Sequence, residues 1–268
     1  MMEPAFIVAL VLTYVGVTFL APWVLARPAL VSAHPRLVLN LWMLALLISL
    51  TSLTLALGAL VARALRHHVE HVADHGWLGP TIDTMLGWAA IAVFGLMTFR
   101  LGVAAQELRA DTHARNLRLL LLVKGAEPTT VGRHTVLLVE SSLHVLGAMP
   151  LRRQVLLTSG LHDALTPQEL EAAVEHEQTH LREHHEVLRG IGQLAVAVAP
   201  IFPASRRMAQ ATRIATELIA DDVAYRFSAK KYGPYVLANA LLAAFPHNSD
   251  ISERVARLRQ RSREEGPR

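Results

Sequence analysis

The sequence predicts a mainly α-helical membrane protein in which three transmembrane helices are followed by a small α+β domain. Two observations lead to this prediction. Apolar residues make up 52% of the 268 residues and charged residues only 18%, a balance that is unusual for a purely soluble domain. Long uncharged runs fill the first hundred residues, whereas from residue 107 onward short strand-like runs and polar helical segments replace them.

Three segments are expected to span the membrane. Residues 5–26 form an uncharged run of 22 residues and residues 37–62 one of 26 residues, so each can cross a hydrocarbon core about 30 Å thick. A cleaved signal peptide is the alternative for the first run, but no basic segment precedes it. Asp83 and Arg100 bound a third, shorter run whose charged ends can reach the interfaces. We therefore expect spans at about 5–26, 37–62 and 80–103, within a transmembrane region of residues 1–106.

Positive charges lie unevenly around these runs. The first loop and the segment after the third run are basic, with Arg27, Arg36, Arg100, Arg109, Arg115, Arg118 and Lys124. The second loop combines Arg63 and Arg66 with Glu70 and Asp74. Because Lys and Arg favour the cytoplasmic side, we expect a multi-pass protein of the cell membrane, with its N-terminus outside and everything after the third span in the cytoplasm.

The second loop also carries a histidine at every fourth position, at His67, His71 and His75. On a helix they would share one face and could bind a metal or respond to pH, although a polar connection without a ligand is the simpler interpretation. The net charge of +4 would also suit nucleic acid. The Arg residues, however, lie beside apolar runs and in the C-terminal tail, which favours a membrane surface. We expect no direct nucleic-acid binding.

Residues 107–250 have the pattern of a small globular domain. Three strand-like runs come first, at 134–139, 143–146 and 154–158. The segment that follows predicts the start of a helix, because Thr166 can cap it, Pro167 suits its first position and Glu169 completes a capping box. We expect this helix to continue to about Leu188.

That helix contains the motif His176-Glu177-Gln178-Thr179-His180. Residues four apart lie on one face of an α-helix, so both imidazoles can bind one metal ion. Glu177 lies beside them, where its carboxylate can act as a general base on a water molecule. The chain has no cysteine, and zinc is the expected metal because imidazole and carboxylate ligands suit it. A chance match on a solvated helix is the alternative, since the chain has 14 histidines.

A third protein ligand has to come from elsewhere in the chain. A histidine six positions after His180 would be the metzincin arrangement, but that residue is Glu186 and the expected glycine is Glu183, so this arrangement is excluded. A helical segment from about 206 to 229 carries Glu217, the expected third ligand. Asp221, one turn further, is expected to orient a ligand histidine through its other ring nitrogen. An ordinary surface Glu–Asp pair is the alternative.

The segment 191–202 between these two helices is apolar. About a dozen apolar residues are too few to cross a bilayer of roughly 30 Å. A single crossing would also place Glu217 on the opposite side of the membrane from His176. We therefore expect either a shallow hairpin that returns from the membrane or a buried helix of the domain.

Taken together, these segments resemble the membrane-bound gluzincin metallopeptidases. The resemblance covers about residues 130–260 and rests on residues 155–158 with Gly160-Leu161, residues 165–170, the His176–His180 motif, Glu217-x-x-Ala220-Asp221, and residues 252–258. Three spans before the zinc domain resemble the beta-lactam sensor-transducer (antirepressor) peptidases more than the HtpX and CAAX-prenyl-protease branch. The chain looks like a short form that lacks the penicillin-binding sensor domain of that family.

The resemblance implies a zincin-like cytoplasmic domain in which His176, His180 and Glu217 bind zinc and Glu177 is the general base. It also implies an activity, namely that of a membrane-anchored zinc metalloendopeptidase in signal transduction. The expected substrate is a cytoplasmic protein, with a DNA-binding transcriptional repressor as a candidate. The lipid bilayer is the other expected partner.

A non-catalytic membrane sensor or scaffold with a structural zinc site is the main alternative. Its basic C-terminal tail, residues 251–268, would bind a partner or anionic lipid, or would be a solvated helix. The presence of Glu177 argues against this alternative, because a structural site needs no base. Metal transport is disfavoured because the first two spans lack ionisable residues.

A metallopeptidase would need two further features. An edge strand around residues 143–146 is expected to hold an extended substrate by strand addition. An oxyanion-stabilising side chain is also expected, with Tyr225, Arg226 and His247 as candidates.

Overall fold

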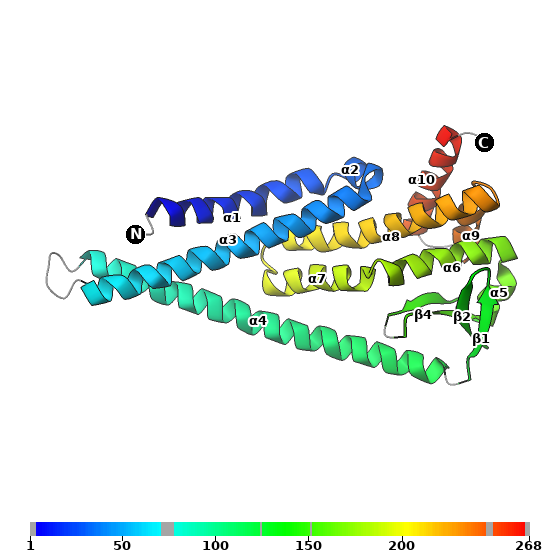
Figure 1. Ribbon diagram of the computed structural model, residues 1–268, viewed down its shortest axis with the longest axis horizontal. Coiled ribbons are helices and arrows are strands. Elements are labelled where there is room, and N and C mark those ends of the chain that lie inside the picture. Colours follow the sequence, from blue (N-terminus) through cyan, green and yellow to red (C-terminus); the bar gives the residue numbers. More distant parts are fainter. Residues whose placement is uncertain (1–3, 71–77, 124, 151, 245–248, 266–268) are drawn as a thin grey trace. The chain divides into compact units, whose positions relative to one another are not determined.

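The computed structural model describes residues 4–70, 78–123, 125–150, 152–244 and 249–265. The chain forms two compact units, residues 1–107 with 191–212 and residues 108–190 with 213–268. Figure 1 follows the elements along the chain. The helices of the described residues are α1 (Pro4–Leu25), α2 (Pro28–Ala33), α3 (Pro35–Glu70), α4 (Leu78–Val123), α5 (Ser159–Ala164), α6 (Pro167–Arg182), α7 (His185–Val198), α8 (Pro203–Lys231), α9 (Val236–Ala244) and α10 (Ser249–Glu265).

The first unit contains the expected spans. Three helical segments within the described residues are long and apolar enough to cross a membrane, namely Pro4–Leu25, Pro35–Arg66 and Thr81–Ala114. Helix α1 packs along α3 (Figure 1), and their outward faces expose large apolar side chains such as Phe19 and Leu47. Exposed apolar surface of this kind indicates contact with a membrane. The protein is therefore a membrane protein with three candidate spanning helices.

The apolar segment 191–202 belongs to the same unit as these helices. Its first part is the second half of α7, and a tight turn then leads into α8. The hydroxyl oxygen of Ser205 closes this turn, because it lies 2.9 Å from the carbonyl oxygen of Ala199 and 2.8 Å from that of Phe202. The two helices approach closely at Gly192, where an added Cβ would lie 3.1 Å from Cα of Ala209. Residues 191–212 therefore form a helical hairpin in the same unit as the candidate spans. A shallow hairpin that returns from the membrane, the first arrangement expected for this segment, requires such a placement.

The second unit is built on a small sheet. Within the described residues its strands are β1 (Glu127–Val131), β2 (His134–Val139), β3 (Leu146–Met149) and β4 (Gln154–Thr158), in the order β1-β2-β4-β3. β2 and β4 are parallel, and the other two pairs are antiparallel. Val136, Val155 and Leu157 are fully buried and pack against Leu170 and Val174 of α6. The sheet therefore forms one wall of the core and α6 the other.

Two strands differ from the prediction. β1 was not expected, since its residues Glu127–Val131 are mostly polar and exposed. A two-residue turn at Gly132, whose φ is +57°, joins it to β2, and glycine is favoured at this position of such turns. β3 covers Leu146–Met149 rather than the predicted run 143–146, and all four of its residues pair with β4.

Helix α6 begins as predicted. The capping box is confirmed, because Thr166 N donates to Glu169 Oε2 at 3.0 Å and Glu169 N donates to Thr166 Oγ1 at 3.4 Å. The helix ends earlier than expected, at Arg182, because His184 adopts a left-handed conformation with φ of 53°. Helix α7 then starts at His185, so Leu188 lies on a separate helix.

Helices α8, α9 and α10 complete the second unit. Tyr225 of α8, Leu237 of α9 and Leu258 of α10 are almost fully buried in one apolar cluster. Residues 251–265, which were expected to belong to a basic tail, thus form a helix with a buried apolar face. Its basic face carries Arg257 and Arg261, both of which contact Asp222 of α8.

Candidate metal centre

The two histidines of the motif face one carboxylate. Within α6 the Nε2 atoms of His176 and His180 lie 3.1 Å apart. Helix α8 brings Glu217 to them, with Oε2 at 3.6 Å from His176 Nε2 and Oε1 at 3.6 Å from His180 Nε2. The three residues predicted as ligands are therefore adjacent, although 37 positions separate His180 from Glu217.

The spacing of these atoms suits a tetrahedral metal ion. Ligand atoms about 2.0–2.1 Å from a zinc ion in tetrahedral coordination lie about 3.3 Å from one another. The two histidine nitrogens lie 3.1 Å apart, and each lies 3.6 Å from a different oxygen of Glu217. One ligand atom from each of the three residues lies within 4.8 Å of the other two. Both imidazoles present the nitrogen that points away from their own backbone. The cluster His176, His180 and Glu217 could hold a metal ion.

Asp221 lies behind His176, one turn beyond Glu217. Its Oδ1 is 3.1 Å from Nδ1 of His176, a buried nitrogen that has no other protein partner among the described residues. The contact is close enough for a hydrogen bond but is not aligned as one. Asp221 is itself fully buried. A proton held on Nδ1 by this carboxylate leaves Nε2 free to bind a metal.

Arg254 of α10 holds Asp221 in place. Its Nε donates to Oδ2 at 2.7 Å and its Nη2 to Oδ1 at 2.5 Å, a two-pronged contact that fixes the carboxylate plane. The third nitrogen, Nη1, lies 2.9 Å from Oε2 of Glu217. One guanidinium therefore positions both the metal-facing carboxylate and the carboxylate behind His176.

Arg189 of α7 contacts Glu217 from the other side. Its Nη2 donates to Oε1 at 2.6 Å, and its Nε donates to Thr216 Oγ1 at 2.9 Å. Glu217 is thus held between two guanidinium groups. Burial alone would raise its pKa, but His176 and Arg254 together hold the pKa of this carboxyl well below its usual range. Glu217 is therefore ionised throughout the physiological pH range.

The two ligand histidines differ in charge. Burial lowers the pKa of His176, but Asp221 and Glu217 more than offset this effect and raise that pKa to about 9. Burial, and then the positive charge of His176, lowers the pKa of His180 to about 2. Without a metal, His176 is therefore a positively charged imidazolium at neutral pH and His180 a neutral imidazole. A metal cation would replace the extra proton of His176.

His185, the first residue of α7, supports His180. Its Nδ1 lies 2.9 Å from Nδ1 of His180, so one of the two nitrogens donates and the other accepts. Burial lowers the pKa of His185 to about 4, which keeps its ring neutral. If His180 donates from Nδ1, its Nε2 keeps the lone pair that a metal needs.

Glu177 lies beside the cluster and contacts the edge strand. Its Oε2 accepts a hydrogen bond of 2.9 Å from the backbone N–H of Ala148 in β3. Burial raises the pKa of Glu177 above that of an ordinary glutamate. A carboxyl group with a raised pKa can both accept and return a proton near neutral pH.

A pocket of about 240 Å³ opens next to these groups in the second unit. His176, Glu177, Glu217 and Arg254 form its polar side. Its remaining wall is apolar and includes Leu146, Leu161, Leu237, Leu241 and Ile251. The pocket can therefore place an apolar group directly beside the candidate metal ligands.

Two of the three residues considered for oxyanion stabilisation, Tyr225 and Arg226, do not line this pocket. Tyr225 is 1% exposed inside an apolar cluster, and Nε of Arg226 donates to the backbone oxygen of Asp222 on an exposed face. His247 lies outside the described residues, as do His71, His75 and the side chain of His67.

No protein-family model, curated protein or solved structure matches this chain. The likeness to gluzincin peptidases therefore consists of the motifs in the sequence.

Proposed function

We propose that the chain is a membrane-anchored zinc metalloendopeptidase that cleaves a cytoplasmic protein. One observation carries the proposal. One ligand atom from each of His176, His180 and Glu217 lies within 4.8 Å of the others, as the ligands of one metal ion would, and Glu177 adjoins them in the same pocket. Two imidazoles, one carboxylate and an adjacent carboxyl group are the donor set of a hydrolytic zinc site.

Each residue of the site has a role in this proposal. A zinc ion held by His176, His180 and Glu217 would lower the pKa of a water molecule to about 7 and polarise the scissile carbonyl group. Glu177 accepts a proton from the attacking water and then delivers it to the nitrogen of the leaving amine. Its raised pKa suits both steps, because the group must be deprotonated first and protonated afterwards.

The residues around the ligands keep the site assembled. Asp221 orients His176, and Arg254 orients Asp221 and Glu217 together. Arg189 balances the charge of Glu217 from α7. Pre-positioned ligands favour metal binding because little ordering remains to be done when the ion arrives.

Strand β3 offers a place for an extended peptide. It lies at the edge of the sheet, and Ala148 directs its N–H towards Glu177 rather than towards β4. Because successive residues of a strand direct their backbone groups to opposite sides, Leu146 also faces the open edge. A substrate strand that pairs there would pass Glu177, and one of its apolar side chains would enter the adjoining pocket.

The nature of the substrate is a proposal based on the resemblance and on the charge pattern. The excess of Lys and Arg after the third span supports a cytoplasmic location for the second unit. In the sensor-transducer peptidases that the sequence resembles, the substrate is a cytoplasmic repressor. A DNA-binding repressor is therefore the first candidate for the protein that this chain cleaves.

Replacement of the general base tests the proposed activity. The full-length chain, purified in detergent with zinc, is incubated with a mixture of peptides rich in apolar residues, and new N-termini are identified by mass spectrometry. We expect cleavage before apolar side chains. Glu177→Gln should slow this cleavage about 10²- to 10⁴-fold, which is the usual contribution of a general base, while zinc content stays the same.

Glu140→Gln is the matched control, because Glu140 is exposed and does not line the pocket. It should cleave like the wild type. Equal cleavage by wild type and Glu177→Gln would contradict the proposal. Bound zinc with no cleavage of any peptide, or of any co-expressed repressor, would instead favour a scaffold with a structural zinc site.

A further inference from the structure

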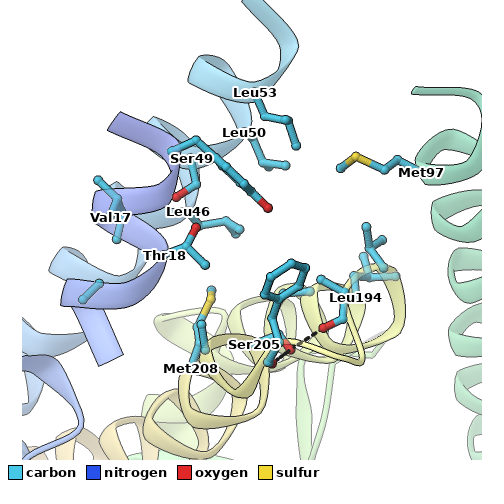
Figure 2. A pocket seen from close by; sticks show the side chains of 18 of the residues that line it. Val17, Thr18, Leu46, Ser49, Leu50, Leu53, Met97, Leu194, Ser205 and Met208 are labelled. Atoms are coloured by element: carbon cyan, nitrogen blue, oxygen red, sulfur yellow. Dashed lines mark hydrogen bonds between the residues drawn. The ribbon is translucent and has the colours of Figure 1, made fainter. Parts of the chain in front are cut away.

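A second cavity lies within the first unit. It has a volume of about 460 Å³ and is lined by residues of α1, α3, α4, α7 and α8. Figure 2 shows Thr18, Ser49, Met97 and Met208 around this space, each from a different helix. A volume of this size lies within the range of about 300–1,000 Å³ that is typical of small-molecule sites.

The lining of the cavity is uncharged. It consists of apolar side chains and a few hydroxyl groups, with no Lys, Arg, Asp, Glu or His among the described residues that line it. Buried charge in a ligand would therefore have no partner, and such burial is strongly unfavourable. The cavity selects against a charged ligand or a lipid headgroup.

Some hydroxyl groups of the lining are bonded within the wall, and others, including those of Thr18 and Ser49, have no partner among the lining residues drawn in Figure 2. Thr98 already binds the carbonyl oxygen of Phe94 at 2.9 Å, and Ser205 contacts the carbonyls of its own turn. Thr18 of α1 and Ser49 of α3 make no hydrogen bond to the lining residues drawn in Figure 2. A donor without a partner in apolar surroundings gains from an acceptor supplied by a ligand.

The position of the cavity along the chain narrows the choice of ligand. Its walls include Thr18, Leu50 and Met97, which lie within the three segments that are able to span a membrane. At that depth the surrounding molecules are lipid chains rather than water. An acyl chain supplies hydrocarbon to fill the space, and its ester supplies an uncharged acceptor.

From these observations we propose that the cavity is a binding site for one acyl chain of a membrane lipid, with the ester group next to Thr18 and Ser49. The site is separate from the candidate metal centre, since its lining residues belong to the first unit and the metal-facing residues to the second. The inference does not depend on the proposed peptidase activity.

Photochemical labelling tests this proposal. The full-length protein is placed in nanodiscs of phosphatidylethanolamine and phosphatidylglycerol that contain a phospholipid with a diazirine on one acyl chain. After illumination and proteolysis, labelled residues are mapped by mass spectrometry. We expect saturable labelling at the cavity, on residues such as Met97 and Met208, in addition to diffuse labelling of outward residues such as Phe19 and Leu47.

Two variants and a control separate the cavity from the outer surface. Ala45→Phe fills the cavity and should lower the cavity labelling about tenfold, which corresponds to about 1.4 kcal/mol of lost binding. Thr18→Val keeps the shape of the side chain and removes the donor, so a decrease of about fivefold is expected. Ala92→Phe adds the same ring to an exposed position of α4 outside the cavity and should change nothing.

Labelling confined to outward residues would overturn the proposal, as would cavity labelling that is unchanged in both Ala45→Phe and Thr18→Val. A protein segment is the other occupant to consider. A photoreactive amino acid placed at position 49 that yields adducts with protein and none with lipid would also overturn it. Because Thr18→Val is nearly isosteric, the test remains decisive if Ala45→Phe fails to fold.

Discussion

Helix α6 contributes to two buried polar clusters. Two consecutive residues of the helix, Glu175 and His176, belong to different clusters. Glu175 faces a cluster with Arg133, His134 and Arg182, whereas His176 faces the candidate metal centre. In the first cluster Arg133 Nη2 lies 2.9 Å and His134 Nε2 2.7 Å from Oε2 of Glu175. In the second, two imidazole nitrogens and a carboxylate converge at 3.1–3.6 Å.

The two clusters differ in whether acceptor atoms converge on one point without a cationic partner there. The single carboxylate of Glu175 is surrounded by donors, and although burial raises its pKa, His134 and Arg133 outweigh burial and lower that pKa overall. The metal centre has two arginines as well, but both are engaged by Glu217 and Asp221. The nitrogens of His176 and His180 still face each other around a point that suits a cation. Converging acceptors, and not buried charge alone, indicate the metal site.

The difference should appear most strongly in the pH dependence of zinc binding. The pKa of His176 is raised to about 9, so at pH 7 zinc must displace its proton. Affinity should therefore fall with acid, by about 100-fold between pH 8 and pH 6 for one displaced proton. Calorimetric titration of the full-length protein in buffers with different ionisation enthalpies counts the released proton. Affinity that is independent of pH would show that the pKa of His176 is not raised.

Asp221 should contribute to zinc affinity although it is not a ligand. Asp221→Asn should weaken binding about 10- to 100-fold, which is typical for groups that orient ligand histidines. It should also move the pH dependence towards acid, because Asp221 helps to raise the pKa of His176. Asp222→Asn is the matched control, since Asp222 contacts Arg257 and Arg261 instead. Competition with a fluorescent zinc chelator measures both, and equal affinities would argue against the role given to Asp221.

Glu175→Gln should have the opposite outcome to Asp221→Asn. Zinc affinity should stay unchanged, and the free energy of unfolding should fall by about 1–3 kcal/mol, because buried hydrogen bonds to a charged group are lost. Glu175 has a lowered pKa, so its contribution is present above the unfolded pKa near 4.5 and is lost as the pH falls further. Thermal unfolding of the full-length protein, followed at pH 7 and pH 4, measures the difference. A loss of zinc binding in Glu175→Gln would contradict the separation of the Glu175 cluster from the metal centre.

The sequence predicted the parts of the site that follow from local rules. The spacing of four between His176 and His180 implies one helix face, and the cap at Thr166 shows where that helix begins. Glu217 and Asp221 repeat the same spacing on a second helix. Helix periodicity and residue type therefore identified four of the residues that the structure brings together at the site.

The remaining partners depend on contacts between distant segments. Arg254 is 33 residues beyond Asp221 and looked like part of a basic tail. The break between α6 and α7 at His184 contains no glycine or proline from which it could have been predicted. This break places His185 against His180 and Arg189 against Glu217. The sequence contained one indication that cationic partners were needed. Three carboxylates, those of Glu177, Glu217 and Asp221, carry more negative charge than one metal ion can balance in a buried site. Cations were needed, but which ones depended on tertiary packing.

Zinc-edge X-ray absorption of the full-length protein with one equivalent of zinc tests the metal centre most directly. We expect one tightly bound ion with four ligands, two of them imidazoles, at about 2.0–2.1 Å. In His180→Ala the imidazole contribution should fall by half and the affinity by more than about 100-fold, beyond the usual loss of a supporting residue. Zinc that does not bind stoichiometrically, or an unchanged spectrum in His180→Ala, would contradict the account.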